Sequence, residues 1–422
     1  MSLHDELHHE CGVFGVYGLD EAAVLTTLGL HSLQHRGQEG AGIVSFDGQT
    51  FHSVRKEGLV GDNFNDADTI SKLPGRNAVG HVRYSTTGDS KLDNIQPFFA
   101  DLACGGFSCA HNGNLTNTKT LRKELVESGS IFRTTSDTEV ILQLVARSRE
   151  TKIVDKIKDA LTKIEGAYSL IIMTNKKLIG IKDPFGIRPL VLGRKNGGYV
   201  LASETCALDI IGAQYVRDVE NGEMVVITDT GLESIRLSTE YKPRPCIFEQ
   251  IYFARPDSIV NGQTVYTYRI NLGQYLAAEY DIDADVIVPI PDSGVPAAIG
   301  YSQQSGVPFE LGIIRNHYIG RTFIEPSQSI RQFGVKLKHS VNRSVIKGKK
   351  VILIDDSIVR GTTANKVVKM VFEAGAKEVH LGISSPPIKH PDFYGIDTPV
   401  QDQLLAANSS LGEMCDFIGA DS

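Results

Sequence analysis

The sequence predicts a two-domain protein, in which an α+β or layered α/β half is followed by a doubly wound parallel α/β half. The chain has 422 residues, more than one compact core usually takes. Its first half is rich in short strand-like runs bounded by Gly, Asp and Asn, with helical patterns between them. Its second half alternates continuous Val/Ile/Leu runs with helical patterns, which is typical of parallel strands buried on both faces.

The first half is expected to hold several strands and at least two helices. The helical patterns are TLRKELVESG (120–129) and SDTEVILQLVARSRE (136–150), and either Ser136 or Asp137 suits the N-cap of the second. Residues 232–246 are polar, contain two prolines and show no clear period, so we predict the domain boundary near residue 240. The strand-like runs are CGVFGVYG (11–18), AGIVSF (41–46), NAVGHVRYST (77–86), FSCAHNGN (107–114), AYSLIIMT (167–174), KLIGIKD (177–183), YVLASE (199–204) and EMVVITDTG (223–231).

The second half reads as alternating strands and helices. Helices are expected over residues 293–306 and 362–376. Strands are expected in ADVIVPIP (284–291), FELGIIRN (309–316), KKVILIDD (349–356) and EVHLGISSPP (378–387).

The bulk composition is that of an ordinary globular protein. Hydrophobic residues make up 41% and charged residues 22% of the chain. No run approaches the ~20 apolar residues of a membrane helix, and residues 1–10, MSLHDELHHE, lack the regions of a secretory signal. The net charge is −7 and no long Lys/Arg block occurs. We therefore expect a cytoplasmic protein with no nucleic-acid and no membrane partner.

The most specific motif is VILIDDSIVRGTT, residues 351–363. Ligands of open parallel sheets gather at the carboxyl ends of the strands, where Asp355 and Asp356 would lie. Two carboxylates there can bind vicinal ribose hydroxyls or help to hold a divalent cation. The following loop offers backbone N–H groups and the hydroxyls of Thr362 and Thr363 at a helix N-terminus, which suits an anion. A sugar phosphate fits both parts, whereas the alternative is a generic strand–helix turn with two solvated acids.

This motif resembles the phosphoribosylpyrophosphate (PRPP) signature of type I phosphoribosyltransferases, and PIPDSG (289–294) resembles their pyrophosphate-binding loop. Residues 317–338 resemble the mobile loop that closes over PRPP in one branch of that family, and their basic side chains suit a polyanion. The resemblance implies Mg2+ as a cofactor, held with PRPP by Ser293, Asp355 and Asp356. The PRPP-binding residues that it implies are Asp292, Ser293, Arg321, Lys336, Asp355, Asp356, Ser357, Arg360, Gly361, Thr362 and Thr363; Arg331 and Lys338 are the other basic residues of the loop.

Five motifs of the first half occur in an order that resembles the N-terminal-nucleophile (Ntn) glutamine amidotransferases. They are ECGVFG (10–15), LHSLQHRGQEG (30–40), GHVRYSTTG (80–88), AHNGNL (110–115) and TSDTE (135–139). The resemblance implies a four-layer αββα domain over residues 11–240, and a phosphoribosyltransferase domain over residues 241–422. It also implies that Cys11 becomes the first residue after loss of a propeptide, residues 1–10. A free α-amino group, with a pKa of roughly 7.7–8.0, can then serve as the base for the thiol.

The same resemblance gives roles to six further residues. Asn112 and Gly113 form the oxyanion hole, Arg83 binds the carboxylate of glutamine and Asp137 binds its ammonium group. Arg36 and Gly37 lie on the loop that closes over this site. Each residue taken singly has another interpretation: Asn-Gly is a strong hairpin-turn signal, Asp137 suits a helix cap and Arg83 suits the surface.

Together the two halves resemble the glutamine phosphoribosylpyrophosphate amidotransferase family. The implied reaction hydrolyses glutamine at Cys11 and passes ammonia through an internal channel to Mg-bound PRPP, giving 5-phosphoribosylamine, pyrophosphate and glutamate. This is the first step of de novo purine biosynthesis. The resemblance also implies feedback inhibition by purine nucleotides and a homo-oligomer, either a dimer or a tetramer.

The six cysteines depart from one branch of that family, which carries a [4Fe–4S] cluster. Cys246 falls at the first ligand position, but Asp392 stands where the second cysteine would be, and no C-x-x-C pair occurs. One thiol of four cannot hold a cluster, so we expect none. The chain also stops early relative to the family, at Ser422. Either the C-terminal tail was lost or the sequence is a fragment.

Two other functions remain open at this point. A glutaminase domain could feed ammonia to a different acceptor, but such enzymes lack the ILIDDSIVRGTT signature. A non-catalytic PRPP-binding regulator is the second alternative, and the presence of Cys11 and of the closing loop disfavours it.

Overall fold

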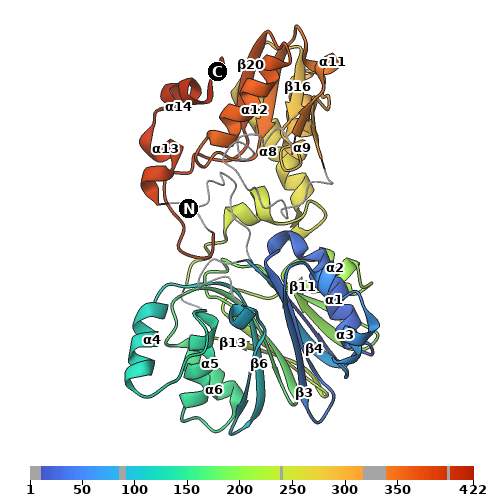
Figure 1. Cartoon of the computed structure of the whole chain (residues 1–422), viewed down its shortest axis with the longest axis vertical. Helices are drawn as coiled ribbons and strands as arrows, with labels where there is room; N and C mark the ends of the chain where they lie inside the picture. The colour runs from blue at the N-terminus through green and yellow to red at the C-terminus, as the bar shows by residue number, and fades with distance from the viewer. Residues whose placement is uncertain (1–10, 85–91, 238–240, 317–338, 397–399) are drawn as a thin grey trace.

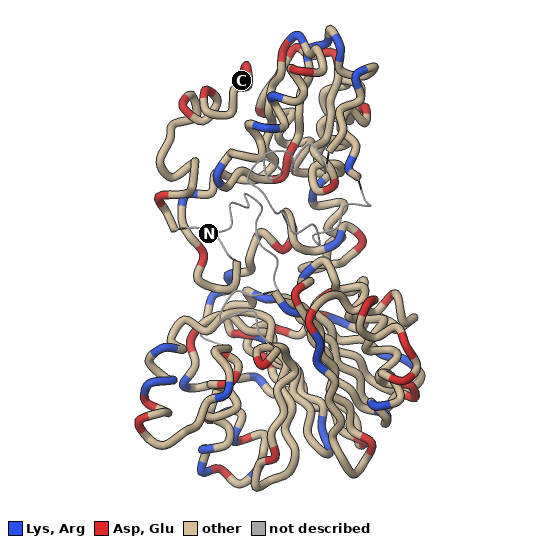
Figure 2. Tube along the Cα trace, viewed as in Figure 1, with Lys and Arg blue, Asp and Glu red and all other residues tan. Residues whose placement is uncertain are grey.

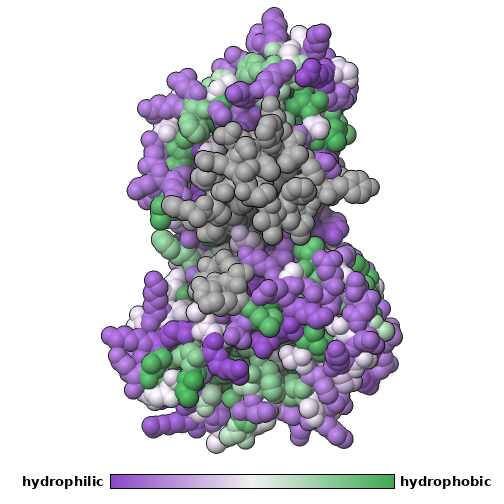
Figure 3. Space-filling view, viewed as in Figure 1, coloured by the Kyte–Doolittle hydropathy of each residue, from purple (hydrophilic) through white to green (hydrophobic). Residues whose placement is uncertain are grey.

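The computed structural model describes residues 11–84, 92–237, 241–316, 339–396 and 400–422. The N-terminal half forms the lower lobe of Figure 1 and the C-terminal half the upper lobe. Acidic and basic residues are interspersed along both lobes (Figure 2). Outside the residues drawn in grey, the face shown in Figure 3 is mainly hydrophilic, with apolar side chains scattered among polar ones. Among the described residues, no helix combines the length and the apolar character that a bilayer crossing requires.

Two antiparallel sheets form the centre of the lower lobe. The first has the strand order β11-β9-β10-β1-β4-β2-β3 and the second β13-β12-β8-β7-β6-β5. The strands of the first are β1 (Gly12–Tyr17), β2 (Gly40–Phe46), β3 (Phe51–Glu57), β4 (Asn77–Arg83), β9 (Val191–Lys195), β10 (Gly198–Ala202) and β11 (Gln214–Asp218). Those of the second are β5 (Phe98–Leu102), β6 (Gly105–Leu115), β7 (Gly166–Thr174), β8 (Lys177–Lys182), β12 (Glu223–Thr228) and β13 (Gly231–Arg236).

Three apolar cores show that these sheets are the middle of four layers. Side chains such as Val13, Val79 and Ile171 fill the space between the sheets. A second core lies between the first sheet and its helices, and a third lies between the second sheet and its helices. The αββα architecture expected from the resemblance is therefore present. The first helical layer contains α1 (Ala22–Ser32), α2 (Val60–Asn63), α3 (Ala67–Ser71) and α7 (Cys206–Asp209), and the second α4 (Thr118–Glu127), α5 (Thr138–Arg147) and α6 (Ile153–Leu161).

The upper lobe contains the predicted parallel sheet, with strand order β16-β19-β20. Alternate residues face opposite sides of it: Val351 and Leu353 join the core under α12, whereas Ile352 and Ile354 join the core under α9. Helices thus cover both faces, and the sheet is doubly wound. The sheet comprises β16 (Val286–Pro289), β19 (Lys350–Asp355) and β20 (Glu378–Ile383), and the helices are α8 (Val265–Glu279), α9 (Val295–Ser305), α11 (Arg343–Ile346), α12 (Thr362–Glu373), α13 (Leu405–Asn408) and α14 (Leu411–Ile418).

The segment FELGIIRN departs from the expected single strand. Phe309 forms only an isolated parallel bridge with Ile287, and the chain then continues into β17 (Ile313–Arg315). β17 pairs with β18 (His339–Val341) in a separate small sheet. A second small sheet, formed by β14 (Ile259–Val260) and β15 (Gln263–Thr264), precedes α8. β13 ends at Arg236 and residues 238–240 lie outside the described part, so the domain boundary near 240 stays a prediction.

Candidate active sites

Cys11 directly precedes the central strand β1 of the first sheet. Gly12 pairs with Val82 of β4, so the start of β1 lies beside the end of β4. Cys11 is buried, and its Sγ lies 3.5 Å from the carbonyl oxygen of Tyr84. Residues 1–10, the predicted propeptide, and residues 85–88 of the GHVRYSTTG motif lie outside the described residues.

The predicted glutamine-binding residues of the first sheet gather around this cysteine. Arg83 ends β4 and is buried. A Cβ at Gly37 would lie 2.6 Å from the carbonyl carbon of Arg83, so the loop can reach β4 only without a side chain there. Arg36 is also buried, and its Nε donates to the carbonyl oxygen of Cys11 at 3.1 Å. Whether Arg36 also contacts glutamine stays a prediction.

Asn112 and Gly113 lie inside β6 and do not form a hairpin turn. Gly113 has φ +140° in the strand, and a Cβ there would collide with the carbonyl oxygen of Ala167 on β7. The side chain of Asn112 is buried, and its Nδ2 has no hydrogen-bond partner within the described ranges. A buried N–H donor without a partner is costly, so this atom is suited to an oxygen of a bound ligand.

Asp137 occupies the N-cap position of α5 but does not cap it with its side chain. Instead, Oδ2 accepts the backbone N–H of Leu115 at 3.0 Å, and Oδ1 lies 3.7 Å from Nδ1 of His111. Burial alone would raise the pKa of Asp137, but the charge of His111 and these hydrogen bonds hold it below its usual value. The carboxylate is therefore anionic, as a partner for an ammonium group must be.

A contact between two buried histidines connects the residues around Cys11 in the first sheet with those around Asn112 in the second sheet. Nε2 of His81 on β4 lies 3.1 Å from the carbonyl oxygen of His111 on β6. Arg83 follows His81 by two residues, and Asn112 follows His111 by one. The structure thus gathers the predicted glutamine residues at one end of the two sheets.

The predicted PRPP loop follows the strand that the sequence indicated. β19 ends at Asp355, whose Oδ1 accepts the backbone N–H of Asp356 at 2.9 Å. The hydroxyl of Ser357 donates to Oδ1 of Asp356. Gly361 has φ +78° and is the N-cap of α12, which begins at Thr362, with Thr363 in its first turn. Burial and the adjacent Asp356 raise the pKa of Asp355 well above its usual value. A bound cation would lower this pKa again.

The predicted pyrophosphate loop lies next to it. Asp292 and Ser293 follow β16, which pairs with β19 in parallel, so both loops leave the same edge of the sheet. A Cβ at Gly294 would collide with the carbonyl oxygen of Ile354, so this turn contacts the end of β19. Arg315 was not foreseen: its Nη1 lies 2.5 Å from Oδ2 of Asp292.

The remaining predicted PRPP-binding residues are Arg360 and the basic residues of the closing loop. Arg360 donates to Oε1 of Gln403 at 3.2 and 3.3 Å. The basic residues of the closing loop, Arg321, Arg331, Lys336 and Lys338, lie outside the described residues.

Sequence reasoning also missed a buried ionic network behind Cys11, formed by Arg36, Arg188, Glu204 and Glu249. Glu249 stands in the apolar run CIFEQIYF, and a lone acid within such a run is a signal of a buried ion pair.

The donor atoms at the carboxyl ends of the parallel strands in the upper lobe are of the kind that suits Mg2+. Asp355, Asp356 and Ser293 offer hard oxygen donors, and Mg2+ commonly takes one or two carboxylates together with substrate phosphates. The carboxylate of Asp392 accepts the backbone N–H of Tyr394 at 2.7 Å. Cys246 packs beside the apolar cluster of Phe253, Val359 and Ile396, so the expectation that no iron–sulfur cluster is present stays a prediction.

Comparison with known proteins identifies the family. Residues 81–209 match the family model of a glutamine amidotransferase domain and residues 268–385 that of a phosphoribosyl transferase domain. The amidophosphoribosyltransferase of Rhizobium etli is 58% identical over 99% of this chain and 86% of its own length. The Bacillus subtilis amidophosphoribosyltransferase is 50% identical over 99% of this chain and 87% of its own length. The chain belongs to the amidophosphoribosyltransferase family.

Solved structures agree with this assignment. The B. subtilis glutamine PRPP amidotransferase, complexed with ADP and GMP, has a TM-score of 0.93 and 49% identity, covering 98% of this chain and 90% of its own. A structure described as the allosteric regulatory enzyme of purine biosynthesis has a TM-score of 0.93 and 50% identity, covering 97% of this chain and 88% of its own. Family membership and the enzyme class, a glutamine-dependent pentosyltransferase, are confirmed.

Proposed function

We propose that this chain performs the reaction of its family, the first step of de novo purine biosynthesis, with the residues described above. Glutamine is hydrolysed in the lower lobe, and the ammonia released passes internally to PRPP in the upper lobe. The products are 5-phosphoribosylamine, pyrophosphate and glutamate.

The glutamine step begins when the free α-amino group of Cys11 takes the thiol proton. Sγ attacks the amide carbon, and the carbonyl oxygen gains negative charge that Nδ2 of Asn112 and the N–H of Gly113 stabilise. As this intermediate collapses, the α-ammonium group of Cys11 returns its proton to the leaving nitrogen, the C–N bond breaks and ammonia departs. A thioester remains, which water cleaves to glutamate. Arg83 binds the α-carboxylate and Asp137 the α-ammonium group, while Arg36 and Gly37 form the adjoining wall of the site.

The PRPP step needs positioning and charge stabilisation more than proton transfer. Asp355 and Asp356 accept hydrogen bonds from the ribose diol, and Ser357, Arg360, Gly361, Thr362 and Thr363 bind the 5-phosphate at the start of α12. Asp292, Ser293 and the basic residues Arg321 and Lys336 bind the pyrophosphate. Ammonia attacks C1, the C1–O bond breaks with its electrons leaving on pyrophosphate, and the nitrogen then loses a proton. Ser293, Asp355 and Asp356 would hold Mg2+, which would neutralise part of the pyrophosphate charge.

Regulation and assembly extend this proposal. The B. subtilis relative was solved with ADP and GMP, which supports purine nucleotides as inhibitors of this chain as well. A homo-oligomer, a dimer or tetramer, and a cytoplasmic location are also proposed. Light scattering that gives the mass of a single chain would contradict the assembly.

The observation that carries the proposal is the buried Nδ2 of Asn112, which has no hydrogen-bond partner within the described ranges. It lies near the end of β6, where Asp137 accepts the backbone N–H of Leu115 and where the neighbouring strand β4 ends at Arg83. The test is glutamate release by the wild-type protein with and without PRPP and Mg2+. We expect PRPP and Mg2+ to stimulate glutamate release. A Cys11→Ala variant should lose glutamine-dependent synthesis and retain synthesis from added ammonia. Loss of both activities in the folded variant would mean that the role given to Cys11 is wrong.

A further inference from the structure

Four charged side chains are buried together where the two lobes meet. Arg36, Arg188, Glu204 and Glu249 expose 0 to 3% of their side-chain surface. Two guanidinium groups face two carboxylates, so the group is electrically balanced. Burying such charges is costly unless each is paired, and removing one partner leaves an uncompensated charge.

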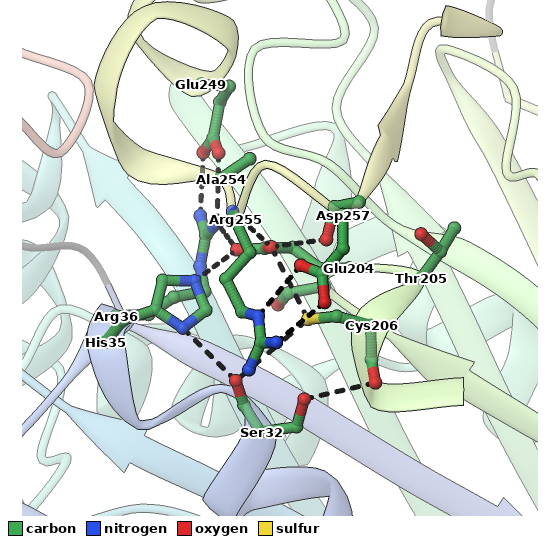
Figure 4. A network of polar contacts seen from close by, with 12 residues as sticks. Ser32, His35, Arg36, Glu204, Thr205, Cys206, Glu249, Ala254, Arg255 and Asp257 are labelled. Carbon is green, nitrogen blue, oxygen red and sulfur yellow. Dashed lines mark hydrogen bonds and ion pairs between the residues drawn. The ribbon is translucent and has the colours of Figure 1, made fainter. Parts of the chain in front are cut away.

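Glu249 is the member that contacts both arginines. Its Oε1 accepts Nη2 of Arg36 at 2.7 Å and Nη1 of Arg188 at 3.4 Å, and its Oε2 accepts Nη1 of Arg36 at 3.0 Å. Figure 4 shows the carboxylate of Glu249 directed at the guanidinium of Arg36, whose Nη1 also donates to Oε1 of Glu204. Glu249 comes from the short π-helix Glu249–Phe253, which lies between β13 and α8 in the chain.

Through Arg36, this carboxylate is linked to the nucleophile. Nε of Arg36 donates to the carbonyl oxygen of Cys11, and Nη1 is held by Glu204 at 2.6 Å and by Glu249. A fixed carbonyl oxygen fixes the peptide plane after Cys11. It therefore limits the directions in which the thiol and the α-amino group of Cys11 can point.

Through Arg188, the same carboxylate is linked to β6, which carries the predicted oxyanion-hole residues Asn112 and Gly113 (the oxyanion strand). Nη2 of Arg188 donates to the carbonyl oxygen of Tyr394 at 2.9 Å. Nδ2 of Asn114 donates to the carbonyl oxygen of Phe393 at 2.8 Å. A Cβ at the next residue, Gly395, would lie 3.1 Å from Nη2 of Arg188 and 3.4 Å from the carbonyl carbon of Gly113. The turn 393–395 of the C-terminal half thus rests on the strand that carries Asn112 and Gly113.

One apolar cluster connects the short helix that carries Glu249, and the turn 393–395, to the PRPP loop. Phe253, in the same short helix as Glu249, packs in a cluster with Val359 of the PRPP loop. Ile396, which directly follows the turn 393–395, belongs to the same cluster, as do Ile388 and Leu404. A change in the packing of the PRPP loop therefore reaches the Glu249 helix and the 393–395 turn through direct contacts.

We propose that Glu249 is a positioning residue that couples the PRPP site to the reactivity of Cys11. This inference rests on the proposed function, and it assigns the coupling to one carboxylate. The carboxylate holds Arg36 and Arg188 in the arrangement that aligns Cys11 with the oxyanion strand. When PRPP binds to the loop that contains Val359, the same contacts stabilise the aligned arrangement, and glutamine hydrolysis accelerates.

The test compares two activities in each variant: glutamate release with and without PRPP and Mg2+, and phosphoribosylamine synthesis from added ammonia. Glu249→Asp keeps the charge, but it is one methylene too short to reach both arginines. Glu249→Gln keeps the length and removes the charge. The matched control is Glu223→Gln, which removes a buried carboxylate paired with Arg217 at 2.7 Å within the lower lobe.

Both Glu249 variants should lower glutamine-dependent kcat/KM roughly 10- to 100-fold, since misalignment of a reacting group by about 1 Å costs this much. PRPP and Mg2+ should no longer stimulate them, while ammonia-dependent synthesis stays within about twofold of the wild type. Glu223→Gln should leave the stimulation intact. If Glu249→Gln fails to fold, Glu249→Asp decides. A folded Glu249→Asp variant that PRPP stimulates like the wild type overturns the inference alone. A wild-type protein that PRPP does not stimulate overturns the proposed function as well.

Discussion

The carboxylate of Asp137 is buried yet charged, a combination that a protein maintains only with specific partners. The backbone N–H of Leu115, the hydroxyl of Thr138 and the ring of His111 surround it. Together they outweigh burial and keep its pKa low. No cationic lysine or arginine is paired with it in the described part of the chain, so a substrate ammonium group would find an anion with bonding capacity left.

An Asp137→Asn variant tests this role. The amide can still accept the N–H of Leu115, but the charge that attracts an ammonium group is gone. We expect KM for glutamine to rise roughly 10- to 100-fold, because a hydrogen bond to a charged group contributes about 1.5–3 kcal/mol. Synthesis from ammonia should not change. Steady-state kinetics with both nitrogen donors measures the effect.

Glu139→Gln is the matched control, since Glu139 is a buried carboxylate in the first turn of the same helix and accepts the N–H groups of Arg133 and Thr134. An unchanged KM in Asp137→Asn, or an equal rise in Glu139→Gln, would contradict the assignment.

At the residue scale, candidate site residues could be predicted from the sequence where they belong to a short local motif. Cys11, Asn112 and Asp355 each stand in such a motif, and the structure places them where a site can form. Glu249 and Arg315 were missed, because their partners Arg36 and Asp292 lie 213 and 23 residues away in the chain. Pairings between distant segments leave almost no local signal.

Among the elements, β4 and β6 belong to different sheets and are joined by His81. Nε2 of His81 lies 3.1 Å from the carbonyl oxygen of His111, and its Nδ1 has no hydrogen-bond partner in the described part. Burial, helped by the charge of Arg83, lowers the pKa of His81 to about 3. The ring is therefore neutral in the folded protein at any pH well above this value.

This shift predicts acid sensitivity of the lower lobe. Between about pH 6.5 and pH 3 the unfolded chain binds a proton at His81 that the folded chain does not, so stability is complete above pH 6.5 and is lost as pH falls. We expect this residue to cost about 2 kcal/mol of unfolding free energy between pH 7 and pH 5. Urea unfolding at the two pH values measures it.

A His81→Gln variant should show a correspondingly smaller pH dependence, because glutamine can still donate to His111 but does not titrate. The comparison at pH 7, where His81 is largely neutral in both states, gives the reference for the substitution itself. An equal loss of stability in variant and wild type would show that another group is responsible.

Element boundaries could be predicted where periodicity was strong, and not where pairing overrides local preference. β19 and α12 appear where VILIDD and TTANKVVKMVFEAGA indicated them. Asn112-Gly113, by contrast, favours a turn locally but is held in β6 by its pairing with Ser169 and Tyr168 of β7. FELGIIRN is interrupted at Gly312, whose backbone N–H donates to the carbonyl oxygen of Glu310 two residues earlier at 2.9 Å, so the chain turns there and does not continue as one strand.

For the whole molecule, the glutamine site depends on removal of the first ten residues as well as on folding. The mechanism needs a free α-amino group at Cys11, but in the encoded chain that nitrogen forms the peptide bond to Glu10. An amide nitrogen is not a base near neutral pH, so residues 1–10 must be removed before glutamine can be used. Cys11 itself is buried at the start of the central strand of its sheet, beside Arg36 and the carbonyl oxygen of Tyr84.

We therefore predict that active protein begins at Cys11, through cleavage of the Glu10–Cys11 bond by the domain itself. Intact-mass measurement on purified, active protein should show the loss of residues 1–10. A Cys11→Ala variant should keep these residues if the thiol performs the cleavage, whereas Cys104→Ala, which removes an exposed thiol, should be processed and active like the wild type. Glutamine-dependent activity in a sample whose mass still includes Met1 to Glu10 would contradict the need for a free amine. A processed Cys11→Ala variant would show that another protease makes the cut.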